Sequence, residues 1–305
     1  MNYQFRFAPY RRPFKTPLRT HHGLWTMRQG IILSLQDEMG RITQGEIAPL
    51  PWFGTETLEE AIAFCAVFGG NITREQIAAI PDTLPACQFG FETAQLNLAS
   101  TENLVSLPPT KFCQLIRRSP TLFQDLQTLL QQGFRTFKLK IALDTPTTEI
   151  ALCQQILAAL PADGRLRLDA NGGLNREQAK YWLNWGESQA KLEFIEQPLA
   201  PEHFSDLLQL NAAFQTQIAL DESVSQLASL EHCYGQGWCG VFVIKLAIAG
   251  FPSRLKEFCQ AHQPDIVIST VFETAVGQRA LLNFSQKFFP SQRALGMGDI
   301  HWFTD

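Results

Sequence analysis

The chain lacks the features that would tie it to a membrane, a nucleic acid or export. Its 305 residues contain no run of eighteen apolar residues, and the N-terminal stretch has no apolar signal region, so we expect neither a membrane span nor secretion. Charged residues make up only 18% of the chain and the net charge is −4, which argues against the basic face of a nucleic-acid binder. A site for an anionic substrate must therefore be locally cationic on an acidic background.

Two further motifs are missing. The seven cysteines are odd in number and form no C-x-x-C, so we expect reduced thiols in a cytoplasmic protein and no disulfide frame or zinc site. No G-x-G-x-x-G or G-x-x-x-x-G-K-[ST] follows a strand candidate, which removes support from a nucleotide-dependent transferase. At 45% hydrophobic residues, the chain has enough apolar side chains for a large core.

What is present is a regular alternation of strand-like and helical segments. At least seven β/α units follow one another at intervals of about 25 residues, which predicts a parallel sheet, and a closed barrel rather than an open sheet. The expected strands are 111–116, 134–141, 165–169, 192–196, 217–220, 240–245 and 265–269. The expected helices include 122–132, 147–160, 176–185, 204–213 and 252–262.

Residues 1–100 follow a different pattern. Strand-like runs at 3–7, 31–36 and 42–47 precede helical stretches at 58–67, 74–79 and 89–99, and this order predicts an α+β domain in front of the barrel. The segment 49–57, PLPWFGTET, is rich in proline, glycine and aromatic residues and should be a loop.

Ionisable residues stand at the ends of successive barrel strands. They are Lys138 and Lys140 on one strand, then Asp169, Glu196, Asp221 and Lys245, with gaps of 29, 27, 25 and 24 residues after Lys140. Lys138 and Lys140 are two residues apart, so they share one face of their strand. Since the carboxyl ends of barrel strands meet at one mouth, we expect three carboxylates to lie there between two groups of lysines.

This combination has a chemical use. Three carboxylates can hold a hard divalent cation, Mg²⁺ or alternatively Mn²⁺, and a bound cation makes a proton next to a substrate carboxylate more acidic. A lysine can remove that proton when burial and neighbouring positive charges favour its neutral form. Each residue alone also has a plainer interpretation, because a single strand-end aspartate often caps a helix and a K-x-K pair often lies at a solvated edge.

At these residues the chain resembles the enolase superfamily. The motifs Lys138-x-Lys140, Asp169-x-Asn171, Glu196-Gln-Pro, Asp221-Glu-Ser and Lys245 fall in the superfamily's order. The resemblance implies a modified TIM barrel, (β/α)7β, over residues 101–290, an N-terminal α+β capping domain over 1–100, and a C-terminal segment, 291–305, returning towards the cap. It implies Lys140 as the base, with Lys138 beside it and Lys245 opposite, and Asp169, Glu196 and Asp221 as metal ligands.

A narrower resemblance, to the o-succinylbenzoate synthase family, rests on four local stretches. They are residues 19–24 (RTHHGL), 45–51 (GEIAPLP), 167–171 (RLDAN) and 268–273 (ISTVFE). It implies a magnesium-dependent syn dehydration of 2-succinyl-6-hydroxy-2,4-cyclohexadiene-1-carboxylate to 2-succinylbenzoate, in menaquinone or phylloquinone biosynthesis. Thr270 and Val271 depart from the family, whose members often have serines there, and Phe272 is bulky enough to reshape the pocket.

Several other residues are candidates for substrate contacts. Arg167 shares a strand face with Asp169, so it either supports the site or forms an ion pair inside the barrel. Asn171, Ser269, Thr270, Arg19 and Thr20 are the remaining substrate-binding candidates. His21 and His22 invite a metal site, but with no partner histidines nearby we interpret them as loop residues. Trp25, Trp52 and Phe53 either shield the site or pack the cap.

Two other functions stay open. Lysines on both sides of the site also permit racemisation of an N-acylamino acid, with Lys140 and Lys245 alternating as bases. A carboxylate-binding barrel without catalysis is the alternative from another class. In each case the expected partner is a small molecule, here a dicarboxylate, and we expect a monomer or weak oligomer without nucleic-acid or membrane partners.

Overall fold

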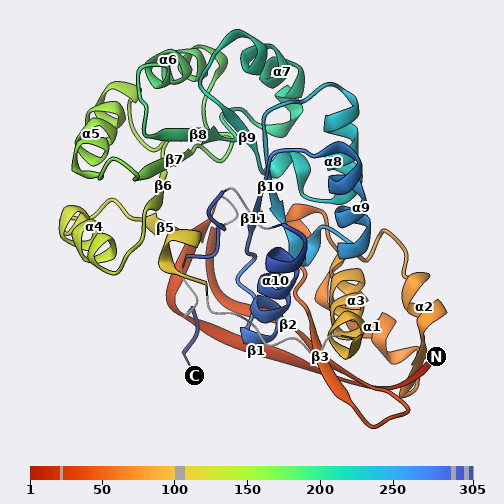
Figure 1. Ribbon diagram of the computed structural model, residues 1–305. Coiled ribbons are helices and arrows are strands. Elements are labelled where there is room, and N and C mark those ends of the chain that lie inside the picture. The colour runs from red at the N-terminus through yellow and green to blue at the C-terminus, as the bar shows by residue number, and fades with distance from the viewer. Residues whose placement is uncertain (21–22, 100–106, 290–292, 299–301, 305) are drawn as a thin grey trace.

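Seven short parallel strands, six of them followed by a helix of the surrounding arc, form the larger part of the molecule (Figure 1). The computed structural model describes residues 1–20, 23–99, 107–289, 293–298 and 302–304. The strands, hydrogen-bonded in chain order, are β5 (Cys113–Ile116), β6 (Thr136–Lys140), β7 (Arg165–Asp169), β8 (Leu192–Glu196), β9 (Ile218–Leu220), β10 (Val241–Lys245) and β11 (Ile266–Ser269). The helices are α4 (Leu122–Gln131), α5 (Pro146–Ala159), α6 (Arg176–Gly186), α7 (Phe204–Ala213), α8 (Leu227–Gly235), α9 (Pro252–His262) and, after β11, α10 (Ala275–Phe288).

The C-terminal segment closes this curled sheet. Leu295 forms a parallel bridge with Phe112, the residue before β5, and Gly296 forms one with Ser269 of β11. The Leu295 N–H donates to Lys111 O and its carbonyl accepts from Cys113 N, each at 2.8 Å, while Gly296 N–H donates to Ile268 O at 2.8 Å. The predicted barrel is therefore confirmed, with an extended C-terminal segment bridging the two edges of its seven-stranded sheet.

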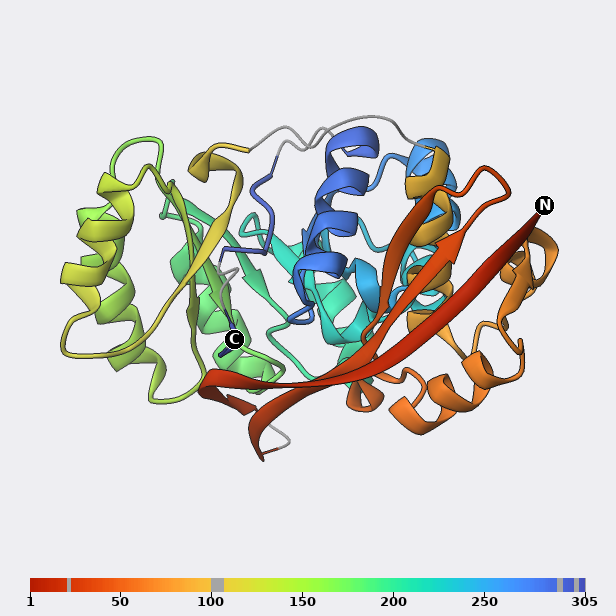
Figure 2. The same ribbon diagram turned by 90° about the horizontal axis from the view of Figure 1, so that it is seen from below.

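The N-terminal part, residues 1–99, is an antiparallel sheet with helices, and we call it the cap. Its strands lie in the order β3 (Ile42–Ile47), β2 (Gly23–Gln36), β1 (Asn2–Thr20), β4 (Asn71–Thr73). Its helices are α1 (Leu58–Ala66), α2 (Arg74–Ala78) and α3 (Pro85–Ala99). Figure 2 shows the long β1–β2 ribbon running from the cap helices across to the barrel strands. At the other chain end, Phe303 forms an antiparallel bridge with Phe14 of β1.

The elements differ from the sequence predictions mainly in the cap. The barrel strands lie within two residues of their expected bounds, but β1 extends to Thr20 and β2 starts at Gly23, well outside the expected 3–7 and 31–36. Much of the added ribbon is exposed and carries arginines and prolines, so it lacks the apolar alternation that marks a half-buried strand. The expected domain boundary near residue 100 lies outside the described residues.

A buried glutamate joins the cap to the barrel. Glu46, at the end of β3, accepts a hydrogen bond of 2.6 Å from the Tyr10 hydroxyl and others from Thr274 N–H and Gly277 N–H, both at 2.9 Å. The Thr274 hydroxyl also contacts it. Thr274 is the N-cap of α10, so the Glu46 carboxylate lies at the positive end of that helix dipole. Helix α10 is consequently held between the cap sheet and the barrel (Figure 1).

Apolar packing extends across both parts. One cluster of buried side chains runs from Tyr3 in the cap to Met297 in the closing segment. A second, smaller cluster lies on four of the barrel strands and consists of Phe194, Ala219, Val241, Val243 and Val267. Ala219 is the register partner of Glu196. None of the helices in the described residues is long and apolar enough to cross a membrane.

Replacing Glu46 with leucine should destabilise the protein by about 3 kcal/mol, because the Tyr10 hydroxyl and two N–H groups of α10 would be left buried without acceptors. Urea unfolding followed by tryptophan fluorescence measures this loss. Glu38→Leu, at an exposed turn residue, is the matched control. Equal unfolding midpoints for the two variants would contradict the role of Glu46.

Candidate active site

The charged residues predicted at the strand ends meet at one mouth of the barrel. Lys140, Asp169, Glu196 and Lys245 are the last residues of β6, β7, β8 and β10, and Asp221 directly follows β9. Lys140 is the register partner of Asp169, which is in turn the partner of Glu196. Parallel pairing in register therefore places the amine and the two carboxylates side by side.

Two lysines lie among the three carboxylates. Lys138 Nζ is 2.9 Å from Asp169 Oδ2 and 3.1 Å from Glu196 Oε1, and Lys245 Nζ contacts Asp221 Oδ1. All three carboxylates are buried, and so is Lys245. Lys138, half-buried within β6, thus bridges two strands, whereas Lys245 pairs with the next strand, β9.

The two acids that share Lys138 differ in acidity. Burial alone would raise the pKa of Asp169, but the charges of Lys138 and Lys140 and a hydrogen bond of 3.1 Å from Asn171 N–H lower it below its ordinary value. Burial and the nearby Asp169 charge raise the pKa of Glu196 in spite of Lys138. Asp169 is therefore the firmer anion of the two.

Lys138 and Lys245 differ in the direction of their pKa shifts. Burial opposes the charge on Lys138, but Asp169 and Glu196 outweigh it and raise its pKa above the ordinary value. For Lys245, burial together with repulsion from Lys138 lowers the pKa to about 7, although Glu196 opposes the shift. The direct contact with Asp221 favours the ammonium form of Lys245, whereas the lowered pKa keeps the neutral amine accessible near pH 7.

A cap loop lies over Lys245. The short 3-10 helix Pro51–Phe53 places the Phe53 ring 4.3 Å from Lys245 Nζ, a cation–π contact. The Gln226 side chain donates to Gly54 O and ties this loop to the barrel. Trp52 packs edge-on against Trp25 at 5.1 Å, so aromatic residues of the cap cover this side of the mouth.

The Gln197 side chain connects the end of β8, which carries Glu196, to the backbone after β9, which carries Asp221. Gln197 directly follows Glu196 and has a positive φ of 37°. Its Oε1 accepts hydrogen bonds from Asp221 N–H at 3.0 Å and Ser223 N–H at 3.2 Å. Its Nε2 donates to Leu199 O at 2.8 Å and to the Ser223 hydroxyl at 2.7 Å. The amide therefore fixes the backbone at Asp221 relative to Glu196.

Glu222 is a residue of the site that the sequence reasoning passed over. Asn171 Nδ2 donates to Glu222 Oε1 at 3.1 Å, and Glu222 Oε2 is buried without a partner among the described residues. Burial and the charge of Asp169 raise the pKa of Glu222 to about 7. The sequence did contain a signal for this residue, because Asp221 and Glu222 are consecutive acids directly after β9. Of the two, only Asp221 was predicted from the sequence to have a role.

Arg167 does not extend to the mouth. Its guanidinium forms a two-pronged ion pair with Glu193, at 2.7 Å from Nε to Oε2 and 3.2 Å from Nη2 to Oε1, and lies 4.9 Å from the Phe194 ring centroid. Of the two interpretations that the sequence allowed, the ion pair inside the barrel describes these contacts. Glu193 lies near the start of β8, and a substrate contact from Arg167 stays a prediction.

Ser269 and Thr270, predicted to contact the substrate, form hydrogen bonds within the chain. The Ser269 hydroxyl donates to Gly296 O at 3.4 Å, and the Thr270 hydroxyl contacts Glu273 while accepting from Phe272 N–H at 2.9 Å. Arg19 and Thr20 end β1 and pair with Leu24 and Gly23 at the tip of the ribbon. His21 and His22 lie outside the described residues.

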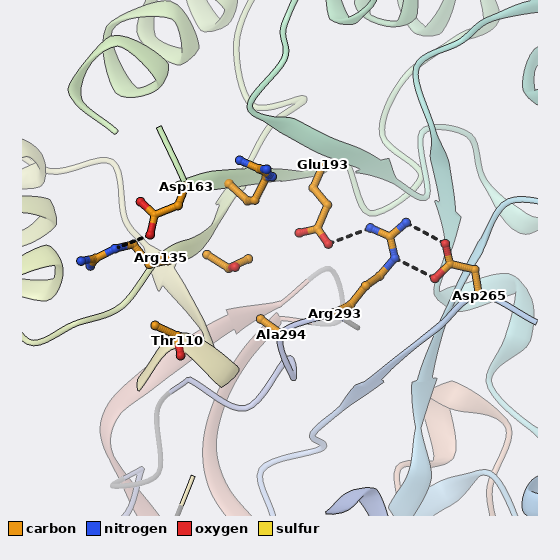
Figure 3. A pocket seen from close by; sticks show the side chains of 9 residues that line it. Thr110, Arg135, Asp163, Glu193, Asp265, Arg293 and Ala294 are labelled. Carbon is orange, nitrogen blue, oxygen red and sulfur yellow. Dashed lines mark hydrogen bonds and ion pairs between the residues drawn. The ribbon is translucent and has the colours of Figure 1, made fainter. Parts of the chain in front are cut away.

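A cavity of about 490 Å³ lies at the opposite end of the barrel (Figure 3). Most of its charged residues form ion pairs, Arg135 with Asp163 and Arg293 with both Glu193 and Asp265, while Arg165 donates to the carbonyls of Ala162 and Gly164. Arg135, Asp163, Glu193 and Asp265 stand at or just before the starts of β6, β7, β8 and β11, at the end of the barrel opposite to Lys140 and Asp169. The strand-end cluster, with its perturbed pKa values, is therefore the candidate site.

Asp169, Glu196 and Asp221 have the donor atoms that a metal ion requires, although their side chains are not arranged around a common point. Across the described part of the chain, no three acidic, histidine or cysteine side chains converge closely enough to hold a metal ion as they stand. Asp169 and Glu196 nevertheless share one cation, the Lys138 ammonium. Carboxylate oxygens from three successive strands are the donors that Mg²⁺ prefers, so this donor set fits the ion.

The chain matches two family models, one on each structural part. Residues 4–98 match the MenC N-terminal domain, and residues 122–287, more than half of the chain, match the enolase C-terminal domain-like family. The bounds of the two matches follow the cap and the β/α units of the barrel.

Individual proteins extend this likeness to nearly the full length. An o-succinylbenzoate synthase of Thermosynechococcus vestitus is 39% identical, with 99% of this chain and 94% of the relative covered. The crystal structure of an o-succinylbenzoate synthase from Thermosynechococcus elongatus, with Mg in its active site, matches at a TM-score of 0.92 and 37% identity over 99% of this chain and 94% of that one. An L-Ala-D/L-Glu epimerase from Bacillus subtilis shares the fold, with a TM-score of 0.80 at 19% identity over 99% and 91% of the two chains. The chain therefore belongs to the o-succinylbenzoate synthase family of the enolase superfamily.

Proposed function

We propose that the protein is an o-succinylbenzoate synthase, which removes water from 2-succinyl-6-hydroxy-2,4-cyclohexadiene-1-carboxylate to give 2-succinylbenzoate. One observation carries the proposal: lysines on β6 and β10 flank three carboxylates at one barrel mouth. The 39% identity to an o-succinylbenzoate synthase over 99% of the chain supports the choice of substrate. The product class places the enzyme in menaquinone or phylloquinone biosynthesis.

Lys140 is the proposed base. Lys138 is occupied by Asp169 and Glu196, which hold it as an ammonium. Lys140 lies two residues further along β6, on the same strand face, and is exposed at the mouth. Its amine takes the proton from the ring carbon that bears the carboxylate, and that carbon–hydrogen bond breaks.

The second half of the reaction uses the same amine. The protonated Lys140 returns its proton to the departing hydroxyl on the same ring face, the carbon–oxygen bond breaks, and water and an aromatic ring result. Lys245 stands on β10, four strands away in the sheet order, and its ammonium stabilises negative charge that develops on the carboxylate side. Because aromatisation favours the second step, the site has to stabilise mainly the first transition state.

Asp169, Glu196 and Asp221 are the proposed ligands of Mg²⁺, with Mn²⁺ as the alternative ion. The bound ion would neutralise the substrate carboxylate and make the neighbouring proton more acidic. Gln197 supports this set, because it ties the backbone of Asp221 to the strand end that carries Glu196.

Lys140→Ala should abolish dehydration, with a fall in kcat of about a thousandfold or more, because a positioned base contributes that order of rate enhancement. The assay follows the loss of diene absorbance, with circular dichroism to verify the fold. Lys180→Ala, at an exposed lysine paired with Glu177 on α6, is the control and should keep wild-type turnover. Wild-type kcat in Lys140→Ala would falsify the base assignment.

Glu196→Gln should weaken Mg²⁺ binding at least tenfold, measured by titration calorimetry with the metal alone, because the ion loses one anionic ligand. Glu177→Gln, which removes an exposed carboxylate on α6, should bind Mg²⁺ as the wild type does. Binding no stronger than background in the wild type would support the carboxylate-binding barrel without catalysis.

A racemase is the second candidate, favoured by the presence of amines on both β6 and β10. Base work on two faces would exchange the α-hydrogen of both enantiomers of an N-succinyl amino acid with solvent. In deuterated water we expect this exchange, followed by proton NMR, to be much slower than diene dehydration. Comparable rates for both enantiomers would instead establish racemisation as an activity of the site.

A further inference from the structure

The loop that follows β6 is gathered around one buried carboxylate. Glu149, in the first turn of α5, accepts hydrogen bonds from three consecutive backbone N–H groups, those of Ala142 at 2.9 Å, Leu143 at 3.0 Å and Asp144 at 3.1 Å. Glu149 is 1% exposed, and Ala142 has a positive φ of 63°. A left-handed alanine costs free energy, so these contacts hold the chain in a shape it would otherwise leave.

An arginine from the neighbouring strand completes the arrangement. Arg118 follows β5 by two residues, and its Nη2 contacts Glu149 Oε1 and also donates to Lys140 O at 3.2 Å. Its Nε is buried without a partner in the described residues. A desolvated and unpaired N–H is costly, and the carboxylate and carbonyl contacts of Nη2 hold the guanidinium in this position.

We propose that Arg118 and Glu149 are positioning residues for Lys140. Neither is part of the strand-end cluster, but together they join the ends of β5 and β6 and the start of α5 around the Lys140 backbone. The inference rests on the proposed function, because it takes Lys140 as the base. A displacement of about 1 Å in a reacting group can reduce a rate by about a hundredfold, so a fixed backbone at this residue matters for proton transfer.

The molecule contains a matched control at the other end of the barrel. Arg135 and Asp163 form an ion pair of 3.1 Å that joins the segments before β6 and before β7. This pair, drawn in Figure 3, also links adjacent strand segments, but Arg135 precedes β6 whereas Lys140 is its last residue, so the pair lies at the other end of the strand. Its loss should affect stability without affecting the base.

The test compares Arg118→Met, Arg118→Lys and Arg135→Met by kcat, KM and the isotope effect of substrate deuterated at the carbon that loses its proton. For Arg118→Met we expect kcat to fall about 10- to 100-fold with KM nearly unchanged, and the isotope effect to rise because proton removal becomes slower than other steps. Arg118→Lys should recover part of kcat, since a cation can still contact Glu149. Arg135→Met should match the wild type in all three quantities.

Wild-type kcat in Arg118→Met, or an equal loss in Arg135→Met, would overturn the proposal. Amide hydrogen exchange over residues 139–146 provides a readout that needs no substrate: it should accelerate in Arg118→Met and stay unchanged in Arg135→Met. Unchanged exchange in Arg118→Met also overturns the inference. If the wild type fails to dehydrate the diene while exchange still accelerates, the proposed function fails, and the pair's hold on the end of β6 is retained.

Discussion

Acids buried at the mouth of a parallel barrel need positive charge beside them, and this requirement organises the molecule. Asp169, Glu196 and Asp221 are all withdrawn from water, and the Lys138 and Lys245 side chains provide the compensation. An unpaired charge in such a place would be strongly destabilising. The same arrangement brings together the acids and amines that the proposed reaction needs.

Around this cluster, buried side chains hold the loops that carry it. Glu46 binds the start of α10, Glu149 binds the loop after Lys140, and Gln197 binds the backbone at Asp221. In each case one side chain accepts backbone N–H groups that have no partner within a helix or strand. Buried polar groups of this kind are satisfied in native proteins, and the resulting loops are more rigid than solvated ones. The precision of a site built on strand ends depends on these contacts.

The cap completes the site in a different way. Its aromatic residues lie over Lys245 and pack against the barrel loop at Phe272, whose φ of 64° is unusual for a bulky side chain. A strained residue held by its packing partners is common at functional sites. The cap rings thus lie beside Lys245, the proposed base and metal ligands stand on the barrel, and Glu46 with the start of α10 joins the two parts.

Much of this follows from the amino-acid sequence alone. The period of the apolar runs determines the β/α units, and a strand-end charge once per unit determines which residues share the mouth, since parallel strands in register bring their carboxyl ends together. Only the tertiary structure decided which amine pairs with which acid, that Arg167 turns to Glu193, and that Glu222, Arg118 and Glu149 belong near the site. The physical reason is that periodicity specifies the face and level of a side chain, whereas its partner depends on long-range contacts between loops that no local pattern records.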